Sequence, residues 1–342
     1  MIDTLINENF RDKSILITGA TGFVGRNLIK ELIKSENYLD NSLKITCVTR
    51  SPQKIFEQWP SERSKLHVLD WDIRQPLTER QPNFDYIFHL AGENRTVANP
   101  QKAKLIFDTS VLGTENLLQA IKQLDVKKII FASSGAVYKQ TYDKAQKFIE
   151  SQEIPKIESD DSDPYRSGKL RAESILEEFR KTSSTQVIIA RMFTFVGPYL
   201  PLDSNFAIGN FFNDCMLKRP ITIKSDGSSI RSYQFSADMV NWLVAILVSG
   251  RSGEIYNIGS AEHVSIKDLA ESIAKVFENK FGVKIFGDQT PDPVSSFYVP
   301  DVEKAKNELG LTNHFSLDDS LLEMRRFLQK YRSNLASTTI TT

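Results

Sequence analysis

Short apolar runs alternate with segments of helical periodicity through the first half of the chain, and this pattern constrains the fold more than any other feature. Parallel strands joined by crossover helices produce such an alternation. The runs are mostly continuous, which suits strands covered on both faces. The predicted strands are Ser14–Thr18, Lys44–Thr49, Leu66–Leu69, Tyr86–Leu90, Lys128–Ser133 and Gln186–Met192, and the predicted helices are Gly25–Ser35, Leu105–Gln123 and Tyr165–Lys181. We therefore predict an α/β fold with a doubly wound parallel sheet.

The second half of the chain is less regular. After Gly197 and Pro198, turn-rich stretches separate shorter helices, which indicates a smaller mixed C-terminal domain. We predict a first domain of residues 1–196 to which 232–259 return, a second domain of residues 197–231 and 260–332, and a frayed tail over 333–342. The longest apolar stretch, Met239–Val248, is too short to span a bilayer and is predicted to be a buried helix.

Composition narrows the possible partners and the compartment. The chain has 342 residues, of which 40% are hydrophobic, so it can bury a sizeable core. Its 43 basic and 43 acidic residues are interspersed, and no overall field points to nucleic acid or to an anionic membrane surface. Cys47 and Cys215 lie far apart, and no basic stretch followed by an apolar one opens the chain, which together favour a reducing cytoplasm.

A glycine cluster, Thr18-Gly-Ala-Thr-Gly-Phe-Val-Gly25, joins the first predicted strand to the first predicted helix. Glycine allows a tight turn and a close approach of the backbone, so main-chain N–H groups and the helix N-terminus can meet a pyrophosphate. A tight strand-to-helix connection alone would also explain the glycines. Their place in the first strand–helix unit favours a dinucleotide cofactor, with contacts from Gly19, Thr21, Gly22, Phe23, Val24 and Gly25.

The end of the second predicted strand bears on which nicotinamide cofactor is bound. An acidic residue there would bind the ribose hydroxyls of NAD and repel the 2′-phosphate of NADP. The strand ends in Val48-Thr-Arg-Ser51 without a carboxylate, and Arg50 can pair with a phosphate. We predict NADP, with NAD as the alternative if Arg50 is only a solvated surface residue.

Tyr165 and Lys169 lie one helical turn apart on a predicted helix, so the phenol and the ammonium project from the same face. A phenol with an ordinary pKa near ~10 is a poor proton donor or acceptor at neutral pH, and a nearby cation makes it more acidic. The same spacing is common by chance. Downstream of a glycine turn and of the pair Ser133 and Ser134, it predicts a redox site.

Five stretches together carry a family resemblance. They are Thr18–Gly25, His89-Leu-Ala-Gly92, Ser133-Ser-Gly-Ala-Val-Tyr138, Tyr165-x-x-x-Lys169 and Arg191-x-Phe-x-x-x-Gly-Pro198. This set resembles the extended short-chain dehydrogenase/reductase family of NAD-dependent epimerases and dehydratases, which implies a Rossmann fold. Phe195–Asp203, Asn205–Asn210 and Arg231–Tyr233 resemble its sugar-nucleotide branch, in particular dTDP-4-keto-6-deoxyhexose reductases of the dTDP-fucose synthase type.

The resemblance implies a role for each site residue. Tyr165 is the catalytic acid/base, Lys169 lowers its pKa and holds the nicotinamide ribose, and Ser134 hydrogen-bonds the reacting oxygen. A hydride added to a ketone leaves an alkoxide, so a proton donor within about 3 Å and a second hydrogen-bonding group suit the reaction. Further cofactor contacts are implied for Asp72, Ile73, Leu90, Ala91, Gly92 and Ser133, and substrate contacts for Asn205 and for Arg231, which grips the pyrophosphate. His89 is expected to be a packed strand residue, and no metal site is predicted.

The chain also departs from the family it resembles. Related 4,6-dehydratases carry an acidic pair directly after the catalytic hydroxyl residue, and decarboxylases carry a glutamate at the second of these positions, whereas this chain has Gly135 and Ala136. Dehydration and decarboxylation therefore lack their additional acid and base. Ser110 and Thr194 replace two asparagines that are common in the family, which alters the expected contacts with substrate and cofactor.

What remains is hydride transfer at a sugar carbon. We expect NADPH-dependent reduction of the C4 ketone of a nucleotide-linked 4-keto-6-deoxyhexose, dTDP-linked by resemblance, for glycan assembly such as O-antigen biosynthesis. A nucleotide-sugar 4-epimerase with tightly bound NAD stays open. A non-catalytic dinucleotide sensor or scaffold on the same fold stays open as well, because a fold alone does not define a function. The resemblance also implies a homodimer.

Overall fold

The computed structural model describes residues 2–93, 95, 98–138, 146–154, 163–203, 206–287 and 296–338. In this part of the chain, the largest sheet has seven strands in the order β11-β6-β5-β4-β1-β2-β3, and every neighbouring pair is parallel. The strands are β1 Ser14–Thr18, β2 Lys44–Thr49, β3 His67–Asp70, β4 Tyr86–His89, β5 Lys128–Ser134, β6 Gln186–Met192 and β11 Ile255–Ile258. The strand order reverses between β1 and β4, which is where doubly wound sheets bind ligands at the carboxyl ends of their strands.

The predicted doubly wound sheet is confirmed, and each predicted strand agrees with an observed one to within one residue at either end. The predicted helices correspond to α2 Phe23–Leu32, α5 Pro100–Ile121 and α6 Pro164–Thr182. Helix α5 begins earlier than predicted because Pro100 occupies its first turn and the side chain of Asn99 caps it, accepting from the amide of Lys102. Proline at the first helical position and asparagine before it are common signals of a helix start.

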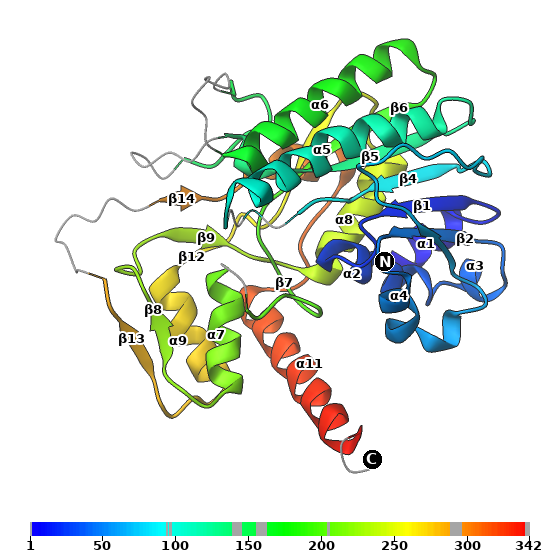
Figure 1. Cartoon of the computed structure of the whole chain (residues 1–342). Helices are drawn as coiled ribbons and strands as arrows, with labels where there is room; N and C mark the ends of the chain where they lie inside the picture. Colours follow the sequence, from blue (N-terminus) through cyan, green and yellow to red (C-terminus); the bar gives the residue numbers. More distant parts are fainter. Residues whose placement is uncertain are drawn as a thin grey trace.

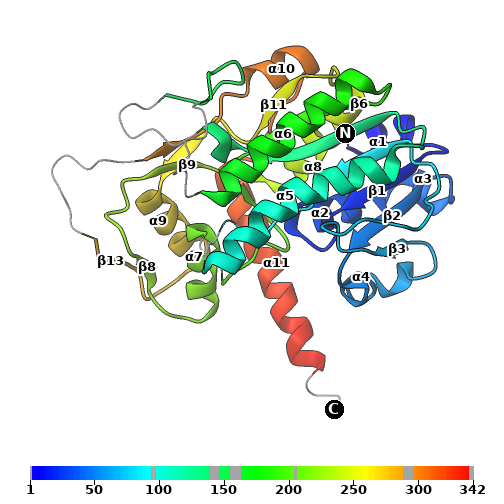
Figure 2. The same cartoon turned by 45° about the horizontal axis from the view of Figure 1, so that its top comes forward.

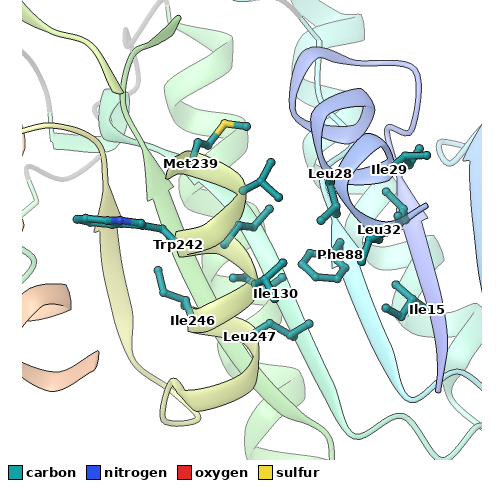
Figure 3. Close-up of a cluster of buried hydrophobic side chains, with 14 of the residues drawn as sticks. Ile15, Leu28, Ile29, Leu32, Phe88, Ile130, Met239, Trp242, Ile246 and Leu247 are labelled. Carbon is teal, nitrogen blue, oxygen red and sulfur yellow. The ribbon is translucent and has the colours of Figure 1, made fainter. Parts of the chain in front are cut away.

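Two layers of helices cover the sheet. Helices α5 and α6 pack against one face, where their apolar side chains join those of β4 and β5 in one cluster. Helix α2, helix α8 (Ser236–Ser249) and an N-terminal helix α1 (Ile2–Asn9) cover the other face. Figure 3 shows Phe88 and Ile130 of the sheet between Leu28 of α2 and Leu247 of α8. Each such fully buried side chain contributes roughly 1.5–3 kcal/mol to folding, so the carboxyl edge of the sheet is a rigid base for a site.

The remaining elements form a smaller lobe beside the sheet (Figure 1). They are β7 Phe195–Val196, α7 Ala207–Met216, β8 Ile221–Ile223, β9 Ile230–Ser232, β10 Gln234–Phe235, β12 His263–Ser265, α9 Ile266–Val276, β13 Val283–Ile285, β14 Phe297–Tyr298 and α11 Leu317–Thr338. A separate apolar cluster joins α7, α9 and α11. Strand β11 and helix α8 return to the large sheet. Helix α10 (Glu303–Leu309), which the predicted boundaries place in the second domain, packs against β11 and α8 instead, because Ala305 is buried in the apolar cluster of the large sheet.

Two segments follow or correct the sequence-based expectations. The stretch Met239–Val248 lies within the buried helix α8, as predicted. Helix α11 continues to Thr338, so the chain from residue 333 to that point is helical rather than frayed, and Figures 1 and 2 both show its last turns projecting beyond the rest of the molecule.

The short helices α3 Glu36–Leu39 and α4 Pro52–Gln58 complete the large domain, with 3₁₀ turns at Pro60–Glu62 (η1) and Gly135–Tyr138 (η2). Across the described ranges, no helix combines the length and the apolar character needed to cross a membrane.

Candidate active site

The glycine turn after β1 has the geometry of a dinucleotide cradle. Gly19 has a φ of 68°, and a Cβ there would lie 2.7 Å from the carbonyl oxygen of Leu90. A Cβ at Gly25 would lie 2.5 Å from the oxygen of Gly19, so both positions require glycine. Helix α2 begins at Phe23, two residues before the predicted start, and no side chain caps it at Gly22. Its first amides and the positive end of its dipole are therefore available to a pyrophosphate, and the residues fit the predicted cofactor.

A buried hydrogen-bond chain holds this turn against the loop after β4. The hydroxyl of Thr18 accepts hydrogen bonds from the amides of Leu90 and Ala91, both at 3.0 Å, so its own hydrogen is directed to His89 Nδ1 at 2.8 Å. His89 Nε2 then carries the ring hydrogen and donates to the hydroxyl of Thr114 at 3.0 Å. Burial lowers the pKa of His89 to about 3, so the ring is neutral. His89 is thus a packed strand residue whose two nitrogens bind threonines.

Charged side chains cluster where β2, β3 and β4 end. Arg50 pairs with Glu93 at 2.9 Å, and Lys102 pairs with the second oxygen of Glu93 at 2.8 Å. Asp72 is bound by the guanidinium of Arg74, which lowers the pKa of the Asp72 carboxyl. Arg50 therefore lies at the predicted cofactor end with half of its side chain exposed, but its guanidinium is shared with a carboxylate from the neighbouring loop.

The apolar part of the cofactor end lies against α5. Ile73 is buried, its carbonyl accepts a hydrogen bond from Asn116 at 3.0 Å, and a Cβ at Gly113 would lie 3.0 Å from its side chain. Gly92 follows Leu90 and Ala91, and a Cβ there would lie 3.5 Å from Lys169 Nζ. The predicted cofactor contacts Ile73, Leu90, Ala91 and Gly92 thus lie along one edge of the sheet, and Gly92 lies next to Lys169.

Helix α6 carries Tyr165 and Lys169 to the end of β5. Its start is defined by Asp163, whose carboxylate accepts hydrogen bonds from the amides of Tyr165 and Arg166 at 3.1 Å, and by Pro164 in the first turn. Arg95, from the loop after β4, forms an ion pair with the same Asp163. The cap therefore connects α6 to the Arg95 cation, which neither the motifs nor the spacing identified.

Lys169 is buried, with 3% of its surface exposed, and donates to the carbonyl of Ala132 at 2.6 Å. Its ammonium lies 4.7 Å from the centre of the Phe131 ring and 6.0 Å from the centre of the Tyr165 ring. Burial lowers the pKa of Lys169 to about 8, and the nearby carboxylate of Glu173 opposes this shift. The lysine is thus held rigidly at the strand end, on the same helix face as Tyr165.

Ser134, rather than Ser133, lies beside the phenol of Tyr165. Its hydroxyl accepts from the amide of Ala136 at 3.2 Å and lies close enough to the phenol to lower the pKa of Tyr165 against the effect of burial. The expectation that the phenol is unusually acidic because of Lys169 is wrong for this arrangement. Burial raises the pKa of Tyr165 above its usual value, and the groups that oppose the shift are the hydroxyl of Ser134 and the guanidinium of Arg95. The physical reason is that the ammonium is turned to the Ala132 carbonyl.

Behind the candidate site, a buried ion pair joins helix α6 to strand β6. Glu173 accepts two hydrogen bonds from Arg191 on β6, at 3.1 and 2.8 Å, and binds the hydroxyl of Ser133. The predicted cofactor contact Ser133 therefore has its side chain engaged away from Tyr165. Glu173 is one helical turn beyond Lys169, so the helical period that paired Tyr165 with Lys169 also points to it.

Breaking this pair is expected to destabilise the protein. Glu173→Gln should lower the free energy of unfolding by about 3 kcal/mol, because it leaves the Arg191 charge buried and uncompensated. Glu177→Gln is the matched control, since Glu177 pairs with Arg180 at the surface of the same helix and should cost less than about 1 kcal/mol. Urea unfolding of both variants checks this, and equal losses would contradict it.

The predicted substrate residues lie in the smaller lobe. Arg231 donates to the carbonyl of Ser296 at 2.9 Å and to its hydroxyl at 2.8 Å, and its guanidinium lies 5.9 Å from the centre of the Tyr298 ring. The Tyr298 hydroxyl in turn lies beside the chain just after Ser134, 2.6 Å from where a Cβ at Gly135 would be. Arg231 is thereby brought toward the carboxyl end of β5. The predicted residue Asn205 lies outside the described residues.

The two family departures have structural roles. Ser110 lies where α5 crosses α6, and a Cβ at Gly168 would come within 3.2 Å of the Ser110 Cβ, so a small residue is needed at this crossing. The hydroxyl of Thr194 binds the carbonyl of Ser232 and so connects β6 to the smaller lobe. Both side chains contribute to packing between elements that carry the site.

Comparisons with known proteins agree with this geometry. The family model described as "NAD dependent epimerase/dehydratase family" matches residues 15–259. UDP-glucuronic acid decarboxylase 1 of Arabidopsis thaliana is 27% identical over 313 residues, which cover 91% of this chain and 68% of the relative. Two solved structures share the fold at 22% identity with TM-scores of 0.76 and cover 93% of this chain: UDP-glucuronic acid 4-epimerase from Bacillus cereus (99% of that chain) and dTDP-glucose 4,6-dehydratase from Bacillus anthracis (97%), both in complex with NAD. With a matched family model across most of its length, the chain belongs to the NAD dependent epimerase/dehydratase family.

Proposed function

We propose that this chain is an oxidoreductase that reduces the C4 ketone of a nucleotide-linked 4-keto-6-deoxyhexose with NADPH, in glycan biosynthesis. The observation that carries the proposal is the convergence of Ser134, Tyr165 and Lys169 beside the dinucleotide cradle, next to a position without an ionisable side chain. Gly135 and Ala136 cannot take or return a proton. The arrangement supports hydride transfer without elimination or decarboxylation.

The residues of the chain supply proton transfer and orientation. The nicotinamide, when bound, supplies the hydride that is added to C4. Ser134 donates a hydrogen bond to the carbonyl oxygen, and Tyr165 gives its hydroxyl proton to that oxygen as the C4–H bond forms. A raised pKa keeps Tyr165 protonated at neutral pH, which is the state that reduction needs. Arg95 then stabilises the phenolate until solvent returns the proton.

Arg50 and the absence of a carboxylate directly after β2 support NADP as the cofactor. One specific observation favours the second candidate, a nucleotide-sugar 4-epimerase with tightly bound NAD: one nitrogen of the Arg50 guanidinium is already paired with Glu93. Arg50→Asp should raise the Michaelis constant for NADPH by about tenfold or more and leave that for NADH nearly unchanged, because a charged contact with phosphate is lost. Steady-state kinetics with both cofactors measures this, and equal use of NADPH and NADH by the natural protein would remove the preference.

The remaining parts of the proposal concern partners and compartment. Arg231 is the proposed pyrophosphate contact, with Asn205 beside the nucleotide, and a dTDP-linked sugar is the proposed substrate. We also propose a homodimer and a cytoplasmic enzyme. The two cysteines, Cys47 and Cys215, are both free thiols, which accords with a reducing compartment.

One experiment separates the candidate functions. Freshly purified protein is denatured, the released cofactor is identified, and NADPH oxidation is measured with a panel of dTDP- and UDP-linked 4-keto sugars. Turnover of a 4-keto sugar supports the reductase. Stoichiometric oxidised NAD together with interconversion of 4-epimers would replace it with the epimerase, and absence of turnover with every substrate would favour a non-catalytic dinucleotide sensor or scaffold.

A further inference from the structure

The outer end of the smaller lobe is a two-stranded parallel sheet of β8 and β13, and Figures 1 and 2 both show it on the opposite side of the molecule from β2. The turns that follow α7 and α9 lie side by side where this sheet begins, because Asn279 Nδ2 donates to the carbonyl of Arg219 at 3.0 Å. The two turns and the small sheet therefore form one surface. We call it the lobe tip, residues 217–224 and 280–286.

Three large apolar side chains are exposed on the lobe tip. Leu217, Phe281 and Phe286 expose 57%, 55% and 69% of their surfaces. Leu217 and Phe281 lie in the two turns, whereas Phe286 follows β13 directly and its amide donates to the carbonyl of Ile223 at 2.9 Å. Ile285 packs against the apolar cluster of the lobe, so Phe286, the next residue, faces outward. Exposed apolar side chains gathered in this way are typical of a surface that binds a partner.

Lysines accompany these apolar side chains. Lys218 and Lys280 each adjoin an exposed apolar residue of the turns, and Lys224 and Lys284 are exposed on the small sheet. Strand alternation places Lys284 and Phe286 on the same outer face, since the residue between them is turned to the core of the lobe. The lobe tip is therefore both basic and apolar.

Neighbouring carboxylates are engaged with other cations. Asp214 is buried and pairs with Arg219 at 2.7 Å, and Glu278 pairs with Arg325 at 2.9 Å. The whole chain has 43 basic and 43 acidic residues, so the positive charge of the lobe tip is a local excess. A partner that fits this surface must carry negative charge and must also accept apolar side chains.

An anionic membrane surface has both properties. Its headgroups attract lysines, each of which strengthens binding by about fivefold, and its interfacial region accepts exposed phenylalanine and leucine. A soluble polyanion would pair with the lysines but would leave the apolar side chains in water. The apolar residues come from two turns and the end of a strand, which suits insertion between lipid headgroups.

We propose that the lobe tip is a docking surface for an anionic membrane, in which Leu217, Phe281 and Phe286 enter the headgroup region and the lysines contact lipid phosphates. The association is peripheral and reversible, because it uses a few side chains at the surface of a folded lobe. The inference does not depend on the proposed reaction, so either can fail without the other.

Co-sedimentation of the full chain with lipid vesicles tests the proposal. The protein should bind vesicles of equal amounts of phosphatidylcholine and phosphatidylglycerol, and should not bind phosphatidylcholine alone. Combining Phe286→Ser with Lys284→Glu should raise the apparent dissociation constant by about tenfold or more. The matched control combines Leu39→Ser with Lys54→Glu, which makes the same chemical changes at exposed positions of the large domain and should leave binding unchanged.

Two results would overturn the proposal. One is that the natural protein does not bind the mixed vesicles, or binds them no better than the lobe-tip variant does. The other is binding to heparin, without binding to vesicles, that Lys284→Glu weakens and Phe286→Ser does not. That result would assign the lysines to a soluble polyanion in place of a membrane.

Discussion

Tyr165→Phe is expected to lower kcat by about 10²–10⁴-fold, which is the range for loss of a positioned acid or base. The phenylalanine keeps the aromatic ring at the start of α6 but leaves no proton donor beside Ser134. Affinity for the cofactor should change much less, because the glycine turn and Lys169 are intact. Single-turnover kinetics with the sugar found in the substrate panel, together with cofactor titration, separates the two effects.

Ser134→Ala provides the comparison for this variant. It removes the hydroxyl beside the Tyr165 phenol but leaves the proton donor, so the loss in kcat should be smaller, about 10–10²-fold. A Tyr165→Phe variant that keeps more than a tenth of the natural kcat would show that another group supplies the proton. Arg95, although it is close, could not do so, since a guanidinium stays charged at any working pH.

The fold could be predicted from the sequence where local signals agree with the tertiary structure. The strands Ser14–Thr18 and Gln186–Met192 were predicted residue for residue, because a buried parallel strand is an apolar run bounded by turn residues. Helix α1 was missed: it is short, its sequence is mixed, and Ile6 becomes part of the core only because the rest of the sheet and α8 are present. The predicted start of α5 differed from the observed one because a capping asparagine and a proline define the observed start.

The residues of the candidate site also differ in how far the sequence could predict them. Residues that belong to one local motif, such as Tyr165 and Lys169 on a single helix, could be predicted from spacing. Residues brought in from elsewhere, such as Arg95 and Tyr298, could not, since their positions depend on a loop contact with Asp163 and on pairing of β14 with β9. Protonation could not be predicted either. The direction of the Tyr165 shift depends on burial, and burial is a property of the whole fold.

Lys169→Met is expected to abolish most activity and to make the protein more stable. The natural ammonium is buried, and its pKa of about 8 compares with 10.5 for an exposed lysine. Burying the charge therefore costs about 3 kcal/mol at neutral pH, partly offset by roughly 1 kcal/mol from the hydrogen bond to Ala132. Methionine has similar length and no charge, so the variant should gain about 2 kcal/mol in the free energy of unfolding.

The pH dependence of stability identifies Lys169 as the source of this gain. Because the folded-state pKa is lower than the unfolded one, the unfolded chain binds more protons between pH 8 and pH 10.5. The stability of the natural protein relative to Lys169→Met should therefore be lowest below pH 8 and should rise by about 3 kcal/mol as the pH approaches 10.5. Urea unfolding of both proteins across this range measures the difference, in which all other titrating groups cancel. A difference that does not change with pH would show that burial of the Lys169 ammonium carries no desolvation cost.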